Sequence, residues 1–159
     1  MGFGVSGILG AKLAAPHRPC IAVIGDGGFT MTPHVLATAV EYDIPCVWLV
    51  WNNYSWAAIR DIQLGMFGGR EIGTGFYAGP NRQPYNPDFA AMARSYGVEG
   101  IAVKHSDQLG DALRHAITKS GTNTLEGYFH PRQLSFAIAA LAVVSFLRGR
   151  YGVMSALLA

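Results

Sequence analysis

The sequence is short of charge and of cysteine. Only 14% of its 159 residues are charged and the net charge is +2, with no basic run and no alternation of basic with aromatic residues. This composition argues against nucleic-acid binding, which needs a basic surface. Two isolated cysteines, Cys20 and Cys46, without a secretory signal indicate reduced thiols, so we expect a cytoplasmic protein.

Long hydrophobic segments are also missing. The uncharged stretch at residues 136–147 is cut short by Arg148 and Arg150, and a membrane span needs about 20 apolar residues. We therefore expect no membrane segment and interpret this stretch as a buried or partner-facing helix. From Gln133 onward only the two arginines are charged, which indicates a C-terminus that is either divergent or out of frame.

Half of the residues are hydrophobic, and the length fits one domain with a core of its own. Two short apolar runs, residues 20–24 and 46–51, predict buried parallel strands. Residues 31–42 between them predict a helix, with Thr32 as its cap and Pro33 at its first position. The resulting βαβ unit predicts an α/β fold, a parallel sheet flanked by helices.

The rest of the chain continues this alternation. Gly97 marks the end of one helix, Ser55 is a candidate cap for another, and residues 65–85 predict a long, glycine-rich loop. The sequence predicts helices at residues 4–15, 56–64, 89–96 and 106–119, and strands at residues 100–103 and 124–128.

A polar motif follows each strand of the βαβ unit. Gly25-Asp26-Gly27 comes after the first strand, and Asn52-Asn53 comes after the second, 24 residues further on. Open α/β sheets bind their ligands at these strand ends. The carboxylate of Asp26 and the amide oxygen of Asn53 are ligands that suit Mg²⁺.

The glycines around Asp26 favour an anion beside that metal. Gly25, Gly27 and Gly28 have no side chain to block a phosphate, and their amides precede a helix N-terminus. Each motif taken singly is also a common turn or loop. Their paired placement after two strands of one unit favours a diphosphate held through a divalent metal.

The two motifs together resemble the thiamine-diphosphate motif, and the surrounding sequence resembles the cofactor-binding C-terminal domain of the acetolactate synthase and pyruvate decarboxylase group. The resemblance covers residues 1–121 and leaves 122–159 as a divergent segment. It implies Mg²⁺ held by Asp26, by Asn53 and by the backbone carbonyl of Ser55. It also implies these cofactor-binding residues: Met1 as an apolar wedge, Gly25, Asp26, Gly27 and Gly28 at the diphosphate, Asn53, Ser55 and Trp56.

The resemblance implies an enzyme that makes or breaks a carbon–carbon bond next to a carbonyl in a 2-oxo acid. Residues 54–60 depart from the Gly-Met-Val pattern of acetolactate synthases, so a different 2-oxo acid or an aldehyde is an equal alternative. Trp56, Met66 and Phe67 are candidates for the substrate pocket, the alternative being ordinary packing of loop hydrophobes.

One part of the family's active site has no match in this sequence. The glutamate that activates the cofactor lies on a pyrimidine-binding domain contributed by another subunit, so the resemblance implies a homo-oligomer in the complete enzyme. No segment here matches that domain, and no catalytic residue is assigned; the four glutamates are Glu41, Glu71, Glu99 and Glu126. The alternative is a truncated, non-catalytic module or subunit that needs a pyrimidine-domain partner.

Overall fold

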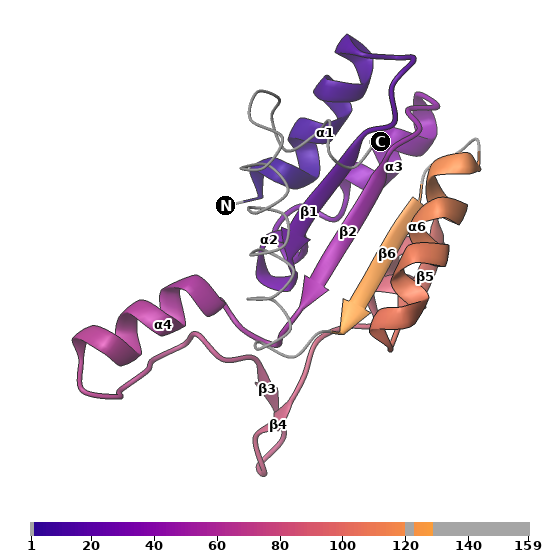
Figure 1. The fold of residues 1–159 in the computed structure, drawn as a ribbon. Coiled ribbons are helices and arrows are strands. Elements are labelled where there is room, and N and C mark those ends of the chain that lie inside the picture. Colours follow the sequence, from indigo (N-terminus) through magenta and orange to yellow (C-terminus); the bar gives the residue numbers. More distant parts are fainter. Residues whose placement is uncertain (1, 120–122, 129–159) are drawn as a thin grey trace, which may run out of the picture. The chain divides into compact units, whose positions relative to one another are not determined.

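Four parallel strands form the sheet that carries the two motifs (Figure 1). The computed structural model describes residues 2–119 and 123–128. Across the sheet the strands follow the order β1 (Ile21–Gly25), β2 (Val47–Asn52), β6 (Asn123–Tyr128) and β5 (Glu99–Val103). In the register of the first pair Gly25 lies opposite Trp51, so both motifs leave the sheet along the edge that the carboxyl ends of the parallel strands form.

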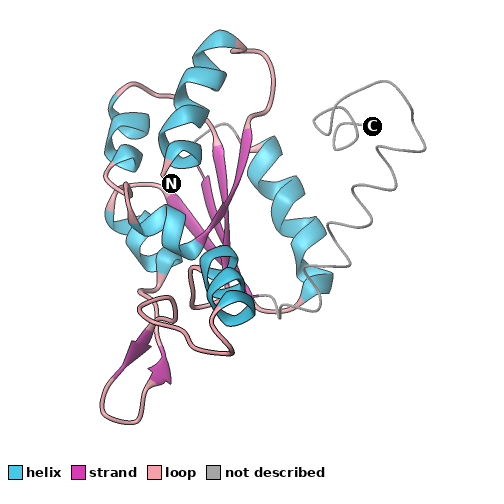
Figure 2. Ribbon diagram, turned by 90° about the vertical axis from the view of Figure 1, so that its left-hand side faces the viewer, coloured by secondary structure: helices cyan, strands magenta, loops and turns pink. Residues whose placement is uncertain are grey.

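Helices cover both faces of this sheet, as Figure 2 shows. The helices are α1 (Phe3–Ala14), α2 (Asp26–Thr30), α3 (Val35–Glu41), α4 (Ala57–Met66), α5 (Phe89–Ser95) and α6 (Leu109–Thr118), and the short 3-10 helix η1 (Ser106–Gln108) precedes α6. Side chains of α1, α2, α3 and α5 pack in the larger core on one face, and α6 covers the other face over Val47 and Leu49.

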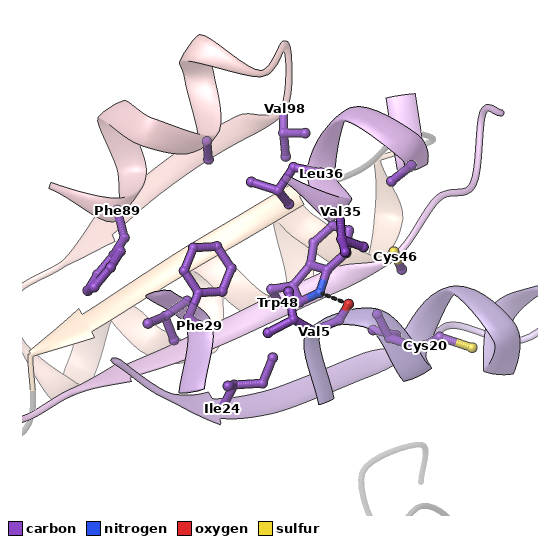
Figure 3. Close-up of a cluster of buried hydrophobic side chains, with 14 residues drawn as sticks. Val5, Cys20, Ile24, Phe29, Val35, Leu36, Cys46, Trp48, Phe89 and Val98 are labelled. Carbon is purple, nitrogen blue, oxygen red and sulfur yellow. Dashed lines mark hydrogen bonds between the residues drawn. The ribbon is translucent and has the colours of Figure 1, made fainter. Parts of the chain in front are cut away.

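The larger core is centred on Trp48 of β2 (Figure 3). Its side chain is fully buried, and its indole Nε1 donates a hydrogen bond to the carbonyl oxygen of Val5, 3.0 Å away. Phe29 of α2 and Phe89 of α5 pack edge to face with ring centroids 5.5 Å apart. The core therefore fixes α2, which begins at Asp26, against the start of α5.

Residues 54–85, which we call the arm, are built differently. The arm contains α4 and a small antiparallel ribbon of β3 (Tyr77–Ala78) and β4 (Gln83–Pro84), and in Figure 1 α4 projects beyond the sheet. No residue of α4 is buried. Polar contacts hold the arm together instead: Gln63 Oε1 accepts from the backbone N–H of Ile72 at 3.0 Å, and Arg60 pairs with Glu71.

The predicted fold class, a parallel α/β sheet flanked by helices, is confirmed, and both strands of the βαβ unit are present. The predicted start of the helix at Thr32 and Pro33 is wrong, because α3 begins at Val35. The backbone N–H groups of Val35 and Leu36 bond three residues back, to Thr32 and Pro33, so this segment is a tight turn. Sequence reasoning also missed α2, which begins at Asp26.

The predicted cap of α4 is wrong as well. Trp56 precedes the first helical residue, and the hydroxyl of Ser55 donates to Asn53 Oδ1 instead. Gly97 does end α5, with the positive φ of 81° that favours glycine. Among the described residues no helix is long and apolar enough to cross a membrane; residues 136–147 lie outside that range.

Candidate functional site

Asp26 lies where β1 gives way to α2, at the edge of the sheet that the sequence predicts for ligand binding. Its side chain is buried, with 1% of its surface exposed. Oδ1 accepts a hydrogen bond from the backbone N–H of Gly27 at 2.9 Å, and Oδ2 accepts one from the amide nitrogen of Asn86 at 2.7 Å. The carboxylate is thus held on both oxygens.

The electrostatics of Asp26 are those of a charge that lacks a counter-ion. Burial raises the pKa of its carboxyl group, and hydrogen bonds from Gly27, Asn86 and the backbones of Tyr54 and Asn53 oppose that rise. Within residues 2–119 no lysine, arginine or histidine forms an ion pair with it. A buried carboxylate surrounded only by neutral donors is a site that a cation would stabilise.

The two asparagines at the end of β2 point to different partners. Asn52 is buried, and its Oδ1 accepts from the backbone N–H of Tyr54 at 3.3 Å and from Asn86 Nδ2 at 2.8 Å. Asn53 Oδ1 accepts from the backbone and the hydroxyl of Ser55, at 3.2 and 3.1 Å. Tyr54 has a positive φ of 58°, which turns the chain sharply at this point.

The three predicted glycines have different surroundings. A side chain at Gly25 would meet no atom within 4 Å, so this position is open. At Gly27 a Cβ atom would lie 2.6 Å from the ring of Trp56, and at Gly28 one would lie 3.1 Å from Ile24. The space over Gly27, which the sequence suggested for a phosphate, is therefore filled by an indole ring.

Trp56 is brought to the motif, and other predicted residues are not. Its ring packs edge to face on Phe76, with centroids 5.6 Å apart. Met66 and Phe67 are exposed at the C-terminal end of α4, the helix that projects beyond the sheet in Figure 1. Met1 lies outside the described residues.

Ser55 is buried and its segment pairs with Gly75, which ties the end of the second motif to the arm. Two of the four glutamates form ion pairs elsewhere: Glu71 with Arg60 in the arm, and Glu99 with Lys119, 3.0 Å away. Among the described residues no group of three or more histidine, cysteine, aspartate or glutamate side chains could hold a metal. A metal at this edge therefore depends on oxygen from amides, backbone and ligand as well as on Asp26.

Sequence reasoning missed Asn86 and the role of Asn52. Asn86 is 60 residues from Asp26 along the chain, and its local pattern, Asn-Pro-Asp before a helix, indicates only a helix start. It also lines a cavity of about 620 Å³ with Asp88, Ala102 and Lys104. Local sequence carries no signal for a contact over such a separation.

Comparison with known proteins assigns the family. The model of a family described as "Thiamine pyrophosphate enzyme, C-terminal TPP binding domain" matches residues 1–126; thiamine pyrophosphate and thiamine diphosphate are the same compound. The chain belongs to this family.

Relatives and a solved structure of this thiamine-diphosphate family agree. The chain is 39% identical to a probable 2-ketoarginine decarboxylase of Pseudomonas aeruginosa, over 79% of this chain and 21% of the relative. It is 33% identical to a probable acetolactate synthase large subunit of Methanocaldococcus jannaschii, over 84% of this chain and 21% of the relative. The chain thus spans about a fifth of these relatives' length.

Among solved structures, the Rhodococcus jostii thiamine diphosphate-dependent 4-hydroxybenzoylformate decarboxylase aligns with a TM-score of 0.71 and 30% identity. The alignment covers 82% of this chain and 24% of that one. The fold and the sequence therefore point to the same cofactor-binding domain.

Proposed function

We propose that Asp26, Asn53 and the backbone carbonyl of Ser55 hold a Mg²⁺ ion that binds the diphosphate of thiamine diphosphate. The observation that supports this most is the buried carboxylate of Asp26, which has only neutral hydrogen-bond donors around it. Mg²⁺ prefers oxygen ligands, and it is commonly held by one or two protein groups together with phosphate oxygens.

Asp26, Asn53 and the open position at Gly25 fit such a group, whereas the ring of Trp56 lies over Gly27. Asp26 supplies one negative charge, and the open position at Gly25 leaves room beside it. Asn53 Oδ1 accepts two hydrogen bonds from Ser55, which metal ligation would replace. When bound, thiamine diphosphate supplies the carbanion chemistry of this enzyme class. The chain's own part is to bind and orient it, with Trp56 packed against Gly27.

We further propose that the complete enzyme makes or breaks a carbon–carbon bond next to a carbonyl in a 2-oxo acid. The support is the relatives, whose names describe decarboxylases and acetolactate synthases, of which this chain spans about a fifth. The pyrimidine-binding domain that supplies the activating glutamate in this family is then a partner of this chain, in a homo-oligomer.

Calorimetric titration of the chain with thiamine diphosphate, in Mg²⁺ and then in EDTA, tests the metal bridge. We expect weak binding that requires the metal. Asp26→Ala should weaken it about a hundredfold, because a charged ligand contributes a few kcal/mol. Equal cofactor binding in Mg²⁺ and in EDTA would contradict the proposed metal bridge.

Asn53→Asp tests the second ligand. The new carboxylate keeps an oxygen for the metal, but it places a negative charge beside the diphosphate, and like charges at short range repel strongly in a partly buried site. We therefore expect weaker cofactor binding than in the parent. Tighter binding by this variant would show that Asn53 does not ligate the metal.

Turnover tests the need for a partner domain. We expect no decarboxylation of pyruvate or benzoylformate by the chain with cofactor and Mg²⁺, because general acid–base assistance of about 10²–10⁴-fold and the correct positioning of the cofactor are both missing. The same assay after mixing with a pyrimidine-binding domain from a related enzyme is the comparison. Turnover by the chain alone would contradict the need for a partner domain and leave Glu41, Glu71, Glu99 and Glu126 as candidate bases.

A further inference from the structure

Asn86 joins the two motifs at the edge of the sheet. Its Nδ2 donates to Asp26 Oδ2 at 2.7 Å and to Asn52 Oδ1 at 2.8 Å. An ionised carboxylate can only accept hydrogen bonds, so the nitrogen of the Asn86 amide must face Asp26. Both hydrogens of this amide are therefore donated, one to Asp26 and one to Asn52.

The amide group separates two oxygens that have no hydrogen of their own. Asp26 carries a negative charge and Asn52 Oδ1 a partial one, so without a donor between them they would repel. A hydrogen bond to a charged acceptor is also about twice as strong as a neutral one. Asn86 thus fixes which way the carboxylate of Asp26 points.

The position of Asn86 is itself fixed by the start of α5. Asp88 caps that helix, with its Oδ1 accepting from the backbone N–H of Ala91 at 2.7 Å. The next residue, Phe89, is fully buried and packs edge to face on Phe29 of α2. Because α2 begins at Asp26, the aromatic pair and the amide bridge connect the same two elements.

We propose that Asn86 is a positioning residue, which holds the Asp26 carboxylate and the end of β2 in the arrangement that binds the metal and diphosphate. It acts through Asp26 and is not itself a ligand. This inference rests on the proposed function, because it needs Asp26 to bind the metal. It adds a residue from a segment outside both motifs to the cofactor site.

Three variants of the full chain test this role. Asn86→Leu keeps the approximate shape and removes both donors. Arg94→Met is the matched control, because it removes a hydrogen bond to the carbonyl oxygen of Gly100 at the other end of α5. The measurement is calorimetric titration with thiamine diphosphate in saturating Mn²⁺, which takes the same octahedral oxygen ligands as Mg²⁺, together with the thermal midpoint of each variant.

We expect Asn86→Leu to weaken metal-dependent binding about tenfold or more, since it removes a charge-assisted hydrogen bond. Arg94→Met should lower the thermal midpoint slightly and leave the affinity within about threefold, because the hydrogen bond that it removes lies at the opposite end of α5 from Asn86. If the two variants lost affinity equally, Asn86 would have only a structural role and the proposal would be overturned.

Asn86→Asp supplies a readout that packing alone would not move. It places a second carboxylate beside Asp26, so the two charges repel in the metal-free chain, and a divalent cation relieves the repulsion. We expect Mn²⁺ alone to raise the thermal midpoint of this variant by more than it raises that of the parent. An equal or smaller rise would contradict the positioning role, and this test stands even if Asn86→Leu does not fold.

The parent chain separates failure of this inference from failure of the proposed function. If the parent binds cofactor with Mn²⁺ and Asn86→Leu binds as tightly, the proposed function stands and the role of Asn86 is wrong. If the parent shows no metal-dependent binding, the proposed function is wrong and the role of Asn86 falls with it.

Discussion

The βαβ unit, residues 21–52, and the arm, residues 54–85, meet at the same edge of the sheet and are stabilised in different ways. In the unit, β2 lies between two other strands and its side chains are buried on both faces. In the arm, α4 buries no residue, and side-chain hydrogen bonds and one ion pair connect its turns. Burial of apolar surface contributes far more to stability than exposed polar contacts do.

This difference assigns separate tasks to the two regions. The unit supplies a rigid base from which Asp26 emerges, whereas the arm brings Trp56 over Gly27 and pairs with Ser55 through Gly75. Regions with few buried contacts open at low free-energy cost, so the arm is the part of the site that we expect to rearrange when a ligand binds.

The largest effect should come from the core of the unit. Trp48→Ala removes a fully buried indole and its hydrogen bond to the carbonyl oxygen of Val5, so we expect a loss of about 3–5 kcal/mol in unfolding free energy. Ile62→Ala in the arm, where the side chain is 58% exposed, should change it by less than about 0.5 kcal/mol. Urea denaturation followed by circular dichroism measures both. Similar losses of unfolding free energy in the two variants would show that the unit and the arm are stabilised to the same extent by buried side chains.

An intermediate effect is expected where the two regions touch. The Cβ atom of Gly27→Ala would lie 2.6 Å from the ring of Trp56, so the ring must move, at a cost of about 1–3 kcal/mol. The control is Gly25→Ala, where a Cβ atom meets nothing within 4 Å. Tryptophan fluorescence and urea denaturation report the displacement and its cost. If Gly27→Ala were as stable as Gly25→Ala, Trp56 would not pack against the motif.

The pH dependence of stability should report Asp26. Because its pKa is raised in the folded chain, its contribution to stability is fully present below the ordinary aspartate pKa of about 3.9 and is lost as pH rises through the raised value. In metal-free buffer the unfolding free energy of the parent should therefore fall relative to that of Asp26→Asn as the pH rises from about 4. Saturating Mg²⁺ and thiamine diphosphate should reverse this trend. A difference between the two chains that does not change with pH would contradict a desolvated carboxylate.

The smallest effect is expected from the ion pair of the arm. Arg60 and Glu71 are 39% and 23% exposed, and such pairs contribute about 0–1 kcal/mol. Glu71→Gln should leave the thermal midpoint nearly unchanged and increase hydrogen exchange at amides within the arm only. Faster exchange in β1 and β2 as well would mean that the arm and the unit open together.

The contrast between the unit and the arm also explains which parts of the fold could be predicted from the sequence. The strands before each motif and the helix end at Gly97 have strong local signals, an apolar run or a glycine with positive φ, and the structure confirms them. The helix cap assigned to Ser55 was wrong because α4 begins at Ala57, with Trp56 at the cap position, and Ser55 pairs with Gly75 instead. That pairing joins residues 20 positions apart, so the local sequence carries no signal for it.

The sequence likewise predicted only part of the arrangement at the candidate site. The sequence places Asp26 and Asn53 at one edge of the sheet because parallel strands end there together. It does not predict Asn86, which reaches Asp26 only because the packing of Phe89 on Phe29 brings α5 to α2. Nor does it predict that Trp56 fills the space over Gly27, because the path of the arm depends on the pairing of Ser55 with Gly75 and on the packing of Trp56 against Phe76.

The thermal midpoint of the parent and of Asp26→Asn, with and without Mn²⁺ and thiamine diphosphate, tests the central claim most directly. A ligand at a hundred times its Kd stabilises the folded chain by about 2.7 kcal/mol. We predict an upward shift for the parent that needs both Mn²⁺ and cofactor, and little or no shift for Asp26→Asn, whose side chain has the same size and no charge. Equal shifts in the two chains would contradict the assignment of Asp26 as the metal ligand.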